Sequence, residues 1–240
     1  MIKLAISGCQ GRMGSLILEL AFKDLDFSVV CILEAKSHPA LNTKVAHLSI
    51  TDNAYQIKEA DVLIEFTTAE ATMAHVKDCR QYRRAMVIGT TGLNTAQVDQ
   101  IKAAAREIPI VLSPNMSVGV NMFFRLVKEA AQRLPKDSLV KIVEAHHIHK
   151  KDAPSGTAKQ LAQIIKEARG EEVKEIQSIR EGEIIGDHRV FFAGAFDTIE
   201  LRHSAKSRAI FAHGALVAAK WLVNQKPGFY TMEDVLFSQE

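Results

Sequence analysis

Apolar and polar positions along residues 1–116 predict strands and helices in alternation. Short and almost continuous apolar runs occur at 2–7, 27–33, 61–66, 85–90 and 108–113. Apolar positions at helical spacing occur between these runs, at 13–22, 68–81 and 94–107. Strands that lack polar alternation are typical of a parallel sheet covered on both faces. The pattern therefore predicts an α/β fold for this part of the chain.

The pattern changes after residue 116. It predicts a longer helix at 118–133, a strand at 138–147, a helix at about 157–169, and strands at 173–180 and within 184–204. This order is typical of an α+β unit built on an open mixed sheet. The stretch 209–225 is again helical. We see no internal repeat and no flexible linker in the sequence.

Composition adds limits to this picture. The chain has 240 residues, of which 47% are hydrophobic, so it is long enough for one large domain or two modest ones. A formal net charge of +2 gives no reason to expect nucleic acid or a membrane as partner. The three cysteines have no metal-like spacing and fit free thiols in a reducing compartment, so we expect a cytoplasmic protein.

A glycine motif follows the first predicted strand. Gly8, Gly11 and Gly14 in "AISGCQGRMG" are spaced as a variant of the dinucleotide fingerprint, at the opening of the first helix. The glycines permit a tight turn and a close approach of the backbone to a pyrophosphate, and the helix amides then face the phosphates. A plain strand-to-helix turn is the alternative, and three glycines alone do not exclude it.

An acidic residue stands where a ribose is bound in such folds. Glu34 lies at the end of the second predicted strand, twenty residues after Gly14. Its carboxylate favours NADH because it would repel a 2′-phosphate, whereas Lys36 or Arg12 can offer charge to that phosphate. The expected cofactor is therefore NADH or NADPH. The strand ends "FTT" (66–68) and "GTTG" (89–92) can line a nicotinamide pocket, although each alone is more often a turn.

The stretch "HHIHKKDAPSGTA", at 146–158, crowds proton donors against a helix start. A metal site is one interpretation, but adjacent residues of a strand point to opposite faces, so His146 and His147 would diverge. The two lysines would also repel a cation. A basic surface loop is a second interpretation, but it leaves the "PSGT" helix start unexplained. We favour an anion site, because a helix N-terminus beside lysines binds anions and histidine transfers protons near neutral pH.

The two motifs together predict a reductase. A dinucleotide domain supplies a hydride, and the second region offers a carboxylate site and a proton donor. The reaction that fits is reduction of a C=N or C=C bond in a small acidic substrate.

Together with these motifs, further stretches of the chain resemble the dihydrodipicolinate reductase family, now called 4-hydroxy-tetrahydrodipicolinate reductases. The resemblance rests on "EAHHIHKKDAPSGTA" (144–158), "GCQGRMG", "VIGTTG", "NMSVGVN" (115–121) and "FAHGALVAAKWL" (211–222), and it runs the length of the chain. It implies an enzyme of diaminopimelate and lysine biosynthesis that reduces a cyclic dicarboxylic imine with NADH or NADPH.

The resemblance also implies roles for particular residues. His146 is then the acid/base residue and Lys150 the proton donor, with substrate contacts from His147, Gly156 and Thr157. Cofactor contacts are implied for Gly8, Cys9, Gln10, Gly11, Arg12, Met13, Glu34, Gly89, Thr90, Thr91, Ser113, Pro114, Asn115 and Met116. Residues 1–116 plus 209–240 would form the dinucleotide-binding domain, and 117–208 the substrate-binding and oligomerisation domain of a homotetramer.

The chain departs from the family pattern in two places. Many relatives have an arginine directly after the ribose-binding glutamate, where this chain has Ala35, which leaves the cofactor preference open. The segment 178–190 is shorter than in relatives, which leaves the assembly open. Three other functions remain as alternatives: an aspartate dehydrogenase-like enzyme, a nucleotide sensor without turnover, and a metal-dependent hydrolase.

Overall fold

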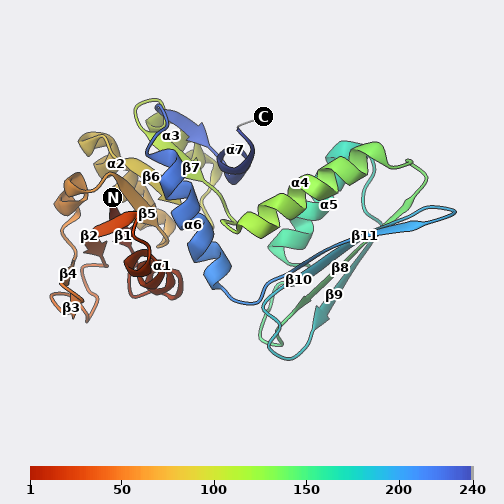
Figure 1. The fold of residues 1–240 in the computed structure, drawn as a ribbon, viewed down its shortest axis with the longest axis horizontal. Helices are drawn as coiled ribbons and strands as arrows, with labels where there is room; N and C mark the ends of the chain where they lie inside the picture. The colour runs from red at the N-terminus through yellow and green to blue at the C-terminus, as the bar shows by residue number, and fades with distance from the viewer. Residues whose placement is uncertain (239–240) are drawn as a thin grey trace. The chain divides into compact units, whose positions relative to one another are not determined.

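The computed structural model describes residues 1–238 and divides the chain into two compact units. The first unit comprises Met1–Val118 together with the segment from Ala209 on, and the second comprises Gly119–Arg208. Figure 1 shows a large sheet with helices on both sides in the first unit, and a smaller sheet with two helices in the second.

An eight-stranded sheet forms the centre of the first unit. Its order is β12-β7-β6-β5-β1-β2-β4-β3, and all pairs are parallel except β3 with β4. The strands are β1 (Ile2–Ser7), β2 (Phe27–Leu33), β3 (Lys44–Val45), β4 (Leu48–Thr51), β5 (Val62–Glu65), β6 (Ala85–Ile88), β7 (Pro109–Leu112) and β12 (Gly228–Tyr230). The predicted α/β class with a Rossmann-like sheet is confirmed.

Both faces of this sheet are covered. Helices α1 (Arg12–Lys23), α6 (Ala209–Leu222) and α7 (Met232–Phe237) pack on one face, and η1 (Ala54–Glu59), α2 (Ala69–Tyr82) and α3 (Thr95–Ala104) on the other. Successive strand residues serve opposite cores, because Leu4 and Ile6 lie in the first cluster and Ala5 in the second. Two-sided burial explains why these strands are continuously apolar in the sequence.

The second unit has a four-stranded mixed sheet with the order β11-β10-β8-β9. Strand β8 pairs parallel with β9 and antiparallel with β10, which pairs antiparallel with β11. The elements are α4 (Val118–Arg133), β8 (Leu139–His146), α5 (Gly156–Arg169), β9 (Glu175–Arg180), β10 (Asp187–Ala193) and β11 (Thr198–Ser204). The open mixed sheet that the sequence predicts is therefore present.

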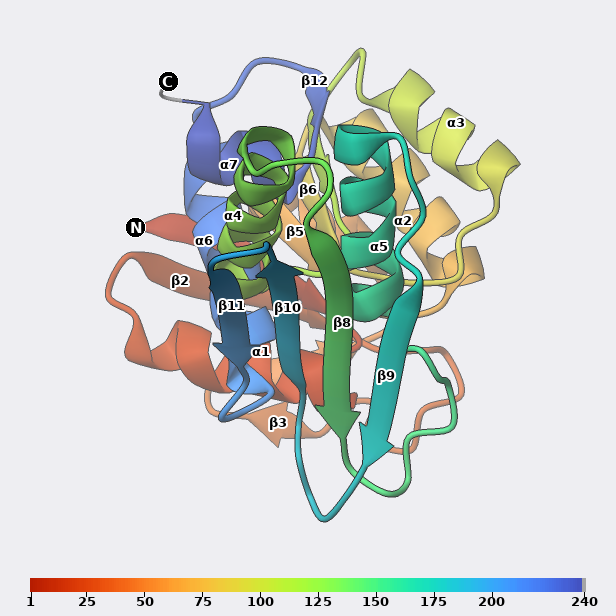
Figure 2. The same ribbon diagram turned by 90° about the vertical axis from the view of Figure 1, so that its right-hand side faces the viewer.

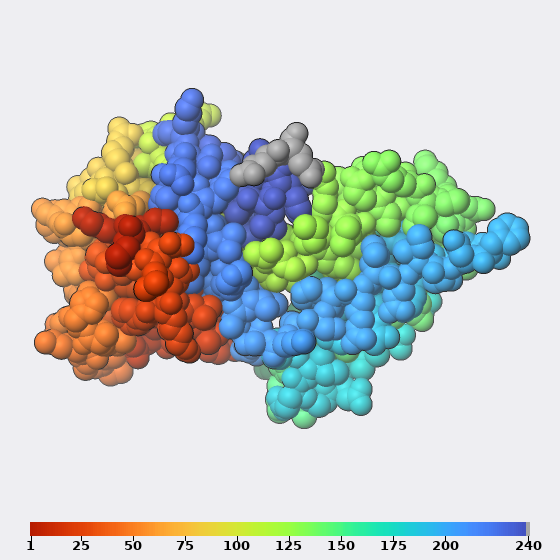
Figure 3. Space-filling view, viewed as in Figure 1, coloured from red at the N-terminus to blue at the C-terminus, as the bar shows by residue number. Residues whose placement is uncertain are grey.

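One face of the small sheet is covered and the other is not. Helices α4 and α5 pack on one face through a cluster that includes Phe123, Leu161, Ile142 and Phe192. Figure 2 shows the uncovered face toward the viewer with both helices behind it. Figure 3 shows the β10–β11 connection (residues 194–197) protruding from this unit, and Phe196 at that connection is fully exposed.

Candidate functional site

The glycine loop between β1 and α1 is closed tightly on itself. Gly8 has a φ of +73°, a conformation that side chains disfavour. A Cβ on Gly14 would lie 1.9 Å from the carbonyl oxygen of Gly8, so the first turn of α1 can pack on the loop only with glycine there. Gly11 caps α1 without any side-chain hydrogen bond, in contrast to the capped helix α2. The first amides of α1 are therefore suited to a phosphate.

Glu34 lies beside this loop, directly after β2. Its Oε1 accepts a hydrogen bond from the backbone amide of Gln10 at 2.7 Å, and its Oε2 accepts one from the amide of Ala35 at 3.2 Å. The carboxylate is thus held at the sheet edge next to the glycine loop. This is the position from which an acidic residue reaches a ribose in a dinucleotide fold.

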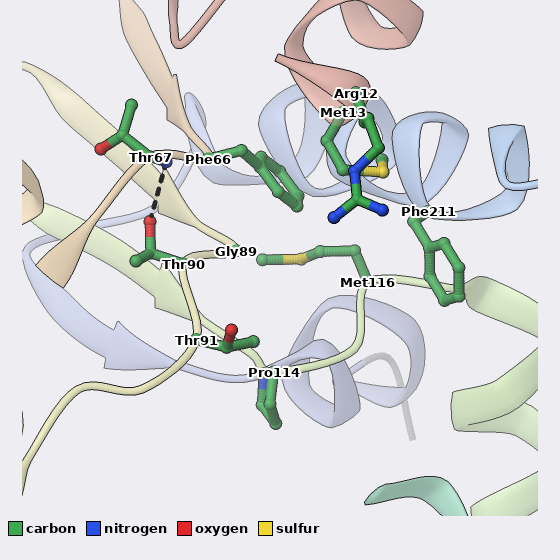
Figure 4. Close-up of a pocket in the computed structure, with 10 residues that line it drawn as sticks. All are labelled: Arg12, Met13, Phe66, Thr67, Gly89, Thr90, Thr91, Pro114, Met116 and Phe211. Carbon is green, nitrogen blue, oxygen red and sulfur yellow. Dashed lines mark hydrogen bonds between the residues drawn. The ribbon is translucent and has the colours of Figure 1, made fainter. Parts of the chain in front are cut away.

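A cavity of about 400 Å³ opens at the same edge of the sheet. Figure 4 shows the Arg12 guanidinium and the Met116 side chain extending into it from opposite sides. Two further lining residues are joined by a hydrogen bond, in which the amide of Thr67 donates to the hydroxyl of Thr90 at 3.2 Å (Figure 4). The lining residues are Arg12, Met13, Phe66, Thr67, Gly89, Thr90, Thr91, Pro114, Met116 and Phe211.

The cavity brings together only some of the residues expected to contact a cofactor. Seven of its lining residues belong to that set: Arg12, Met13, Gly89, Thr90, Thr91, Pro114 and Met116. The other seven lie at the same sheet edge without lining it: Gly8, Cys9, Gln10, Gly11, Glu34, Ser113 and Asn115. The Cys9 side chain is fully buried in the core, and this burial raises its pKa to about 11, so Cys9 offers a ligand only its backbone.

The cavity also includes a residue that is not among those expected at the site. Phe211 comes from α6, far along the chain from the other lining residues. It begins the stretch 211–222 that carries part of the resemblance, but nothing in that stretch assigns it to a binding site. Phe66 and Thr67 do lie at the predicted strand end, and a strand-end position at the carboxyl edge is the signal that identifies them.

A buried carboxylate organises the second unit. Glu144, on β8, has no exposed surface, and three segments of the second unit supply it with hydrogen-bond donors. Arg180 at the end of β9 donates to both its oxygens, at 3.0 and 2.8 Å, and the amide of Ser155 donates at 3.3 Å. The Nδ1 atom of His146, two residues along β8 on the same face, completes the set.

Burial and neighbouring charges act in opposite directions on the pKa of Glu144 and of His146. Burial disfavours the ionised carboxylate, but hydrogen bonds from Arg180, Ser178 and His146 outweigh it and lower the Glu144 pKa. For His146, burial is the largest effect and lowers the pKa, with Glu144 opposing and Lys150 and Arg180 adding to the decrease. His146 is therefore neutral at pH 7, beside an ionised carboxylate.

The loop after β8 carries the remaining predicted residues. The Nζ of Lys150 pairs with Asp152 at 2.7 Å, and the backbone carbonyl of Asp152 accepts from Arg180 at 2.5 Å. Gly156 and Thr157 begin α5, where the Ser155 hydroxyl accepts from the amide of Ala158 at 3.2 Å. The Lys150 side chain is mostly covered, whereas Gly156 at the start of α5 is exposed. One short segment thus holds both a cation and the open amides of a helix N-terminus.

The three histidines of this segment do not converge. His146 is buried beside Glu144, and the rings of His147 and His149 lie 6.1 Å apart at the surface side of the loop. Within residues 1–238, no group of three or more His, Cys, Asp or Glu side chains is placed to hold a metal ion. Over the same part of the chain, no helix is long and apolar enough to cross a membrane.

Sequence reasoning missed the role of three residues around His146: Glu144, Arg180 and His188. Glu144 did carry a signal, because a charged residue two positions before His146 shares its strand face. Arg180 carried none, since its partner is 36 residues away. His188 on β10 bonds the Ser155 hydroxyl through Nε2 at 3.1 Å and stacks edge-on against His146.

Comparison with protein families matches both halves of the chain. The model described as "Dihydrodipicolinate reductase, N-terminus" matches residues 2–116, and the one described as "Dihydrodipicolinate reductase, C-terminus" matches residues 119–236. The matched segments together cover nearly the whole chain.

Individual relatives agree with the family models. The chain is 39% identical to 4-hydroxy-tetrahydrodipicolinate reductase of Syntrophus aciditrophicus, over 98% of both chains, and 38% identical to that of Nitrosomonas europaea, again over 98% of both. Among solved structures, dipicolinate-bound dihydrodipicolinate reductase from Paenisporosarcina sp. TG-14 is similar with a TM-score of 0.82 and 26% identity, over 96% of this chain and 97% of that one.

The alignment with the Syntrophus relative extends over 264 positions, more than the 240 residues of this chain. It therefore contains gaps opposite this chain. In the structure, β9 and β10 are joined by the six residues between Arg180 and Asp187, within the segment 178–190 that is expected to be shorter than in relatives.

Because His188 is buried, we expect the stability of the protein to depend on pH. Burial, with a smaller contribution from His146, lowers its pKa to about 4. Between pH 6.5 and 4 the unfolded chain therefore takes up a proton that the folded chain does not, so the free energy of unfolding falls as the pH falls. Replacing His188→Gln removes this effect, which is on the order of 3 kcal/mol.

Denaturant unfolding of both proteins at pH 7, 5.5 and 4 measures the difference. The wild type loses more stability on acidification than His188→Gln does, whereas the exposed control His149→Gln follows the wild type. Equal losses in wild type and His188→Gln would contradict the assignment of a neutral, buried His188.

Proposed function

This chain belongs to the dihydrodipicolinate reductase family, and we propose that it reduces 4-hydroxy-tetrahydrodipicolinate to tetrahydrodipicolinate with NADH or NADPH. The observation that carries the proposal is that both family models match along the chain, one over each half. In the second half, the match coincides with a histidine, a lysine and an open helix start in one segment. An aspartate dehydrogenase-like enzyme would need only the first half and leaves this segment without a role.

The first unit fits a nicotinamide dinucleotide. The closed glycine loop and the uncapped start of α1 suit the pyrophosphate, and Glu34 suits the adenosine ribose. The cavity lined by Met13, Thr90 and Met116 suits the nicotinamide end. When bound, the cofactor supplies a hydride to the substrate. We assign the cofactor contacts to Gly8, Cys9, Gln10, Gly11, Arg12, Met13, Glu34, Gly89, Thr90, Thr91, Ser113, Pro114, Asn115 and Met116.

The second unit fits a small dicarboxylate. The amides of Gly156 and Thr157 begin α5, where the helix dipole favours negative charge. We assign one substrate carboxylate to these amides. Lys150 adds a cation in the same segment, and His147, half-buried beside His146, adds a ring donor.

Reduction of an imine also consumes a proton. We assign its delivery to His146 and Lys150, the two groups of this segment that can transfer one. The ionised Glu144 stabilises His146 when the ring takes up a proton, and binding of a dianionic substrate favours the same charged form. Lys150 serves both the charge of the substrate and the proton.

The assay that tests the proposal follows cofactor oxidation at 340 nm, with substrate generated in place by the preceding synthase. NADH and NADPH are compared in parallel, and the ratio of kcat/KM values reports how Glu34, Ala35 and Lys36 act together. We expect substrate-dependent turnover. A folded protein that binds nucleotide but oxidises neither cofactor would contradict the proposed reaction.

Replacement of the proposed acid/base residue separates chemistry from cofactor binding. His146→Gln lowers kcat by on the order of 10²–10⁴, because one positioned proton donor is lost. The cofactor dissociation constant stays near that of the wild type, since His146 lies outside the glycine-loop unit. An unchanged kcat would remove His146 from this role.

Replacement of Lys150 affects binding and turnover together. Lys150→Ala raises KM and lowers kcat, since the same ammonium group serves the substrate charge and the proton. Lys151→Ala, an exposed neighbour of the same charge, is the matched control and leaves both constants close to the wild type. An effect of Lys150→Ala confined to cofactor affinity would exclude the substrate role.

The uncovered face of the small sheet suits assembly, and we place a homotetramer interface there. Phe191, Val143 and Ile179 lie half-exposed on this face, flanked by the ion pairs Lys141–Glu175 and Arg202–Asp187. An apolar centre with a charged rim is typical of a protein interface. We also place the enzyme in the cytoplasm, where its three free cysteines stay reduced.

Light scattering of the purified protein tests the assembly. We expect the wild type to have the molar mass of a tetramer. Phe191→Glu lowers the measured molar mass, because it places a charge at the apolar centre of the face. Phe22→Glu, an exposed phenylalanine of the first unit, is the control and leaves the mass unchanged. A monomeric wild type would exclude the interface.

A further inference from the structure

The side chain of Glu144 serves two elements of the proposed site at once. It holds the Nδ1 atom of His146 and also the amide of Ser155, the residue that caps α5 before Gly156 and Thr157. Arg180 holds both oxygens of Glu144 and, through the same guanidinium, the carbonyl of Asp152. One carboxylate and one guanidinium thus connect His146, the Lys150 loop and the start of α5.

We infer that Glu144 and Arg180 are positioning residues that fix the tautomer and orientation of His146, an inference that rests on the proposed function. An ionised carboxylate accepts hydrogen bonds and donates none, so the proton of a neutral His146 ring resides on Nδ1. The Nε2 atom then carries the free lone pair. The same pair, by holding Asp152, also fixes the segment that carries Lys150.

The surroundings of Nε2 support this arrangement. A Cβ on Gly186 would lie 3.1 Å from Nε2 of His146, so the backbone passes close to this atom and glycine keeps a side chain of its own from crowding it. The charged and titratable groups that face His146 are Glu144 from β8, Arg180 from β9, His188 from β10, and Lys150 from the loop. Glu144 alone among them is negative, so it is the one group that favours the charged ring.

Arg180 is also the last residue of β9, at the start of the short connection to β10, and Gly186 is the last residue of that connection. The two ends of this connection therefore supply the guanidinium that holds Glu144 and the glycine that lies beside Nε2. The Arg180 fork makes two parallel bonds to the carboxylate, and lysine cannot reproduce them.

The experiment measures the ring directly. Histidine labelled with ¹⁵N reports the tautomer and the pKa of His146 through its ring nitrogens, and the His146→Gln protein identifies the signal. In the wild type we expect Nδ1 protonated and Nε2 free at pH 7.5. Glu144→Gln lowers the His146 pKa because it removes the facing negative charge, and Arg180→Gln raises it because it removes a facing positive charge. Equal titrations in all three proteins would overturn the inference.

Kinetics distinguish positioning from support of the fold. We expect kcat to fall on the order of 10²–10⁴ in Glu144→Gln, comparable to loss of the proton donor itself. The double variant Glu144→Gln/Arg180→Gln removes both charges of the pair, so it recovers stability relative to either single variant but not kcat. Recovery of kcat together with stability would show that the pair serves the fold alone and would overturn the inference.

Two controls complete the design. Arg133→Gln breaks the exposed Arg133–Glu129 pair of α4 and leaves the ring signals and kcat unchanged. Arg180→Lys keeps the charge without the fork, so it keeps the His146 pKa closer to the wild type than Arg180→Gln does, while kcat stays reduced. If the wild type shows no turnover at all, the proposed function fails, and the ring measurements still decide whether Glu144 and Arg180 set the His146 tautomer.

Discussion

A carboxylate with no exposed surface must be matched by donors, and the second unit is arranged around this requirement. Isolated in an apolar interior, the Glu144 charge would cost several kcal/mol. Its two oxygens instead receive a bidentate guanidinium, a backbone amide and an imidazole. These donors come from the ends of β8 and β9 and from the cap of α5, so satisfying one charge fixes three segments relative to each other.

The first unit meets a different constraint, which is close approach of the backbone. The start of α1 lies against the carbonyl of Gly8 with no room for a side chain, and Gly11 leaves the helix amides without a cap. Glycine as the N-cap is only roughly a few tenths of a kcal/mol less stabilising than a capping side chain, so the helix amides are left open at little cost to α1. A bound phosphate supplies the missing acceptors, so this loop is built to be completed by a ligand.

The sequence predicted the elements of both sheets well because each depends on local pattern. Continuous apolar runs identified β1, β2, β5, β6 and β7, and the glycine spacing identified the loop before α1. The short elements β3, β4, η1, β12 and α7 were not predicted, since two to six residues carry too little periodicity. Phe211 and Arg180 could not be predicted for another reason: their partners are distant in sequence, and only the tertiary fold brings them together. Glu144 lies between these cases, because strand alternation places it beside His146 but does not reveal what neutralises it.

The thiols of this protein share one property with a practical consequence. Cys9, Cys31 and Cys79 are all buried, and burial raises the pKa to about 11 for Cys9, to about 12 for Cys31, and well above its usual value for Cys79. A thiol that stays protonated and covered reacts slowly with alkylating reagents and disulfides. The three native cysteines therefore do not need to be removed before thiol-directed labelling. A cysteine introduced at the exposed position 196 would react in their place and carry a fluorophore or spin label.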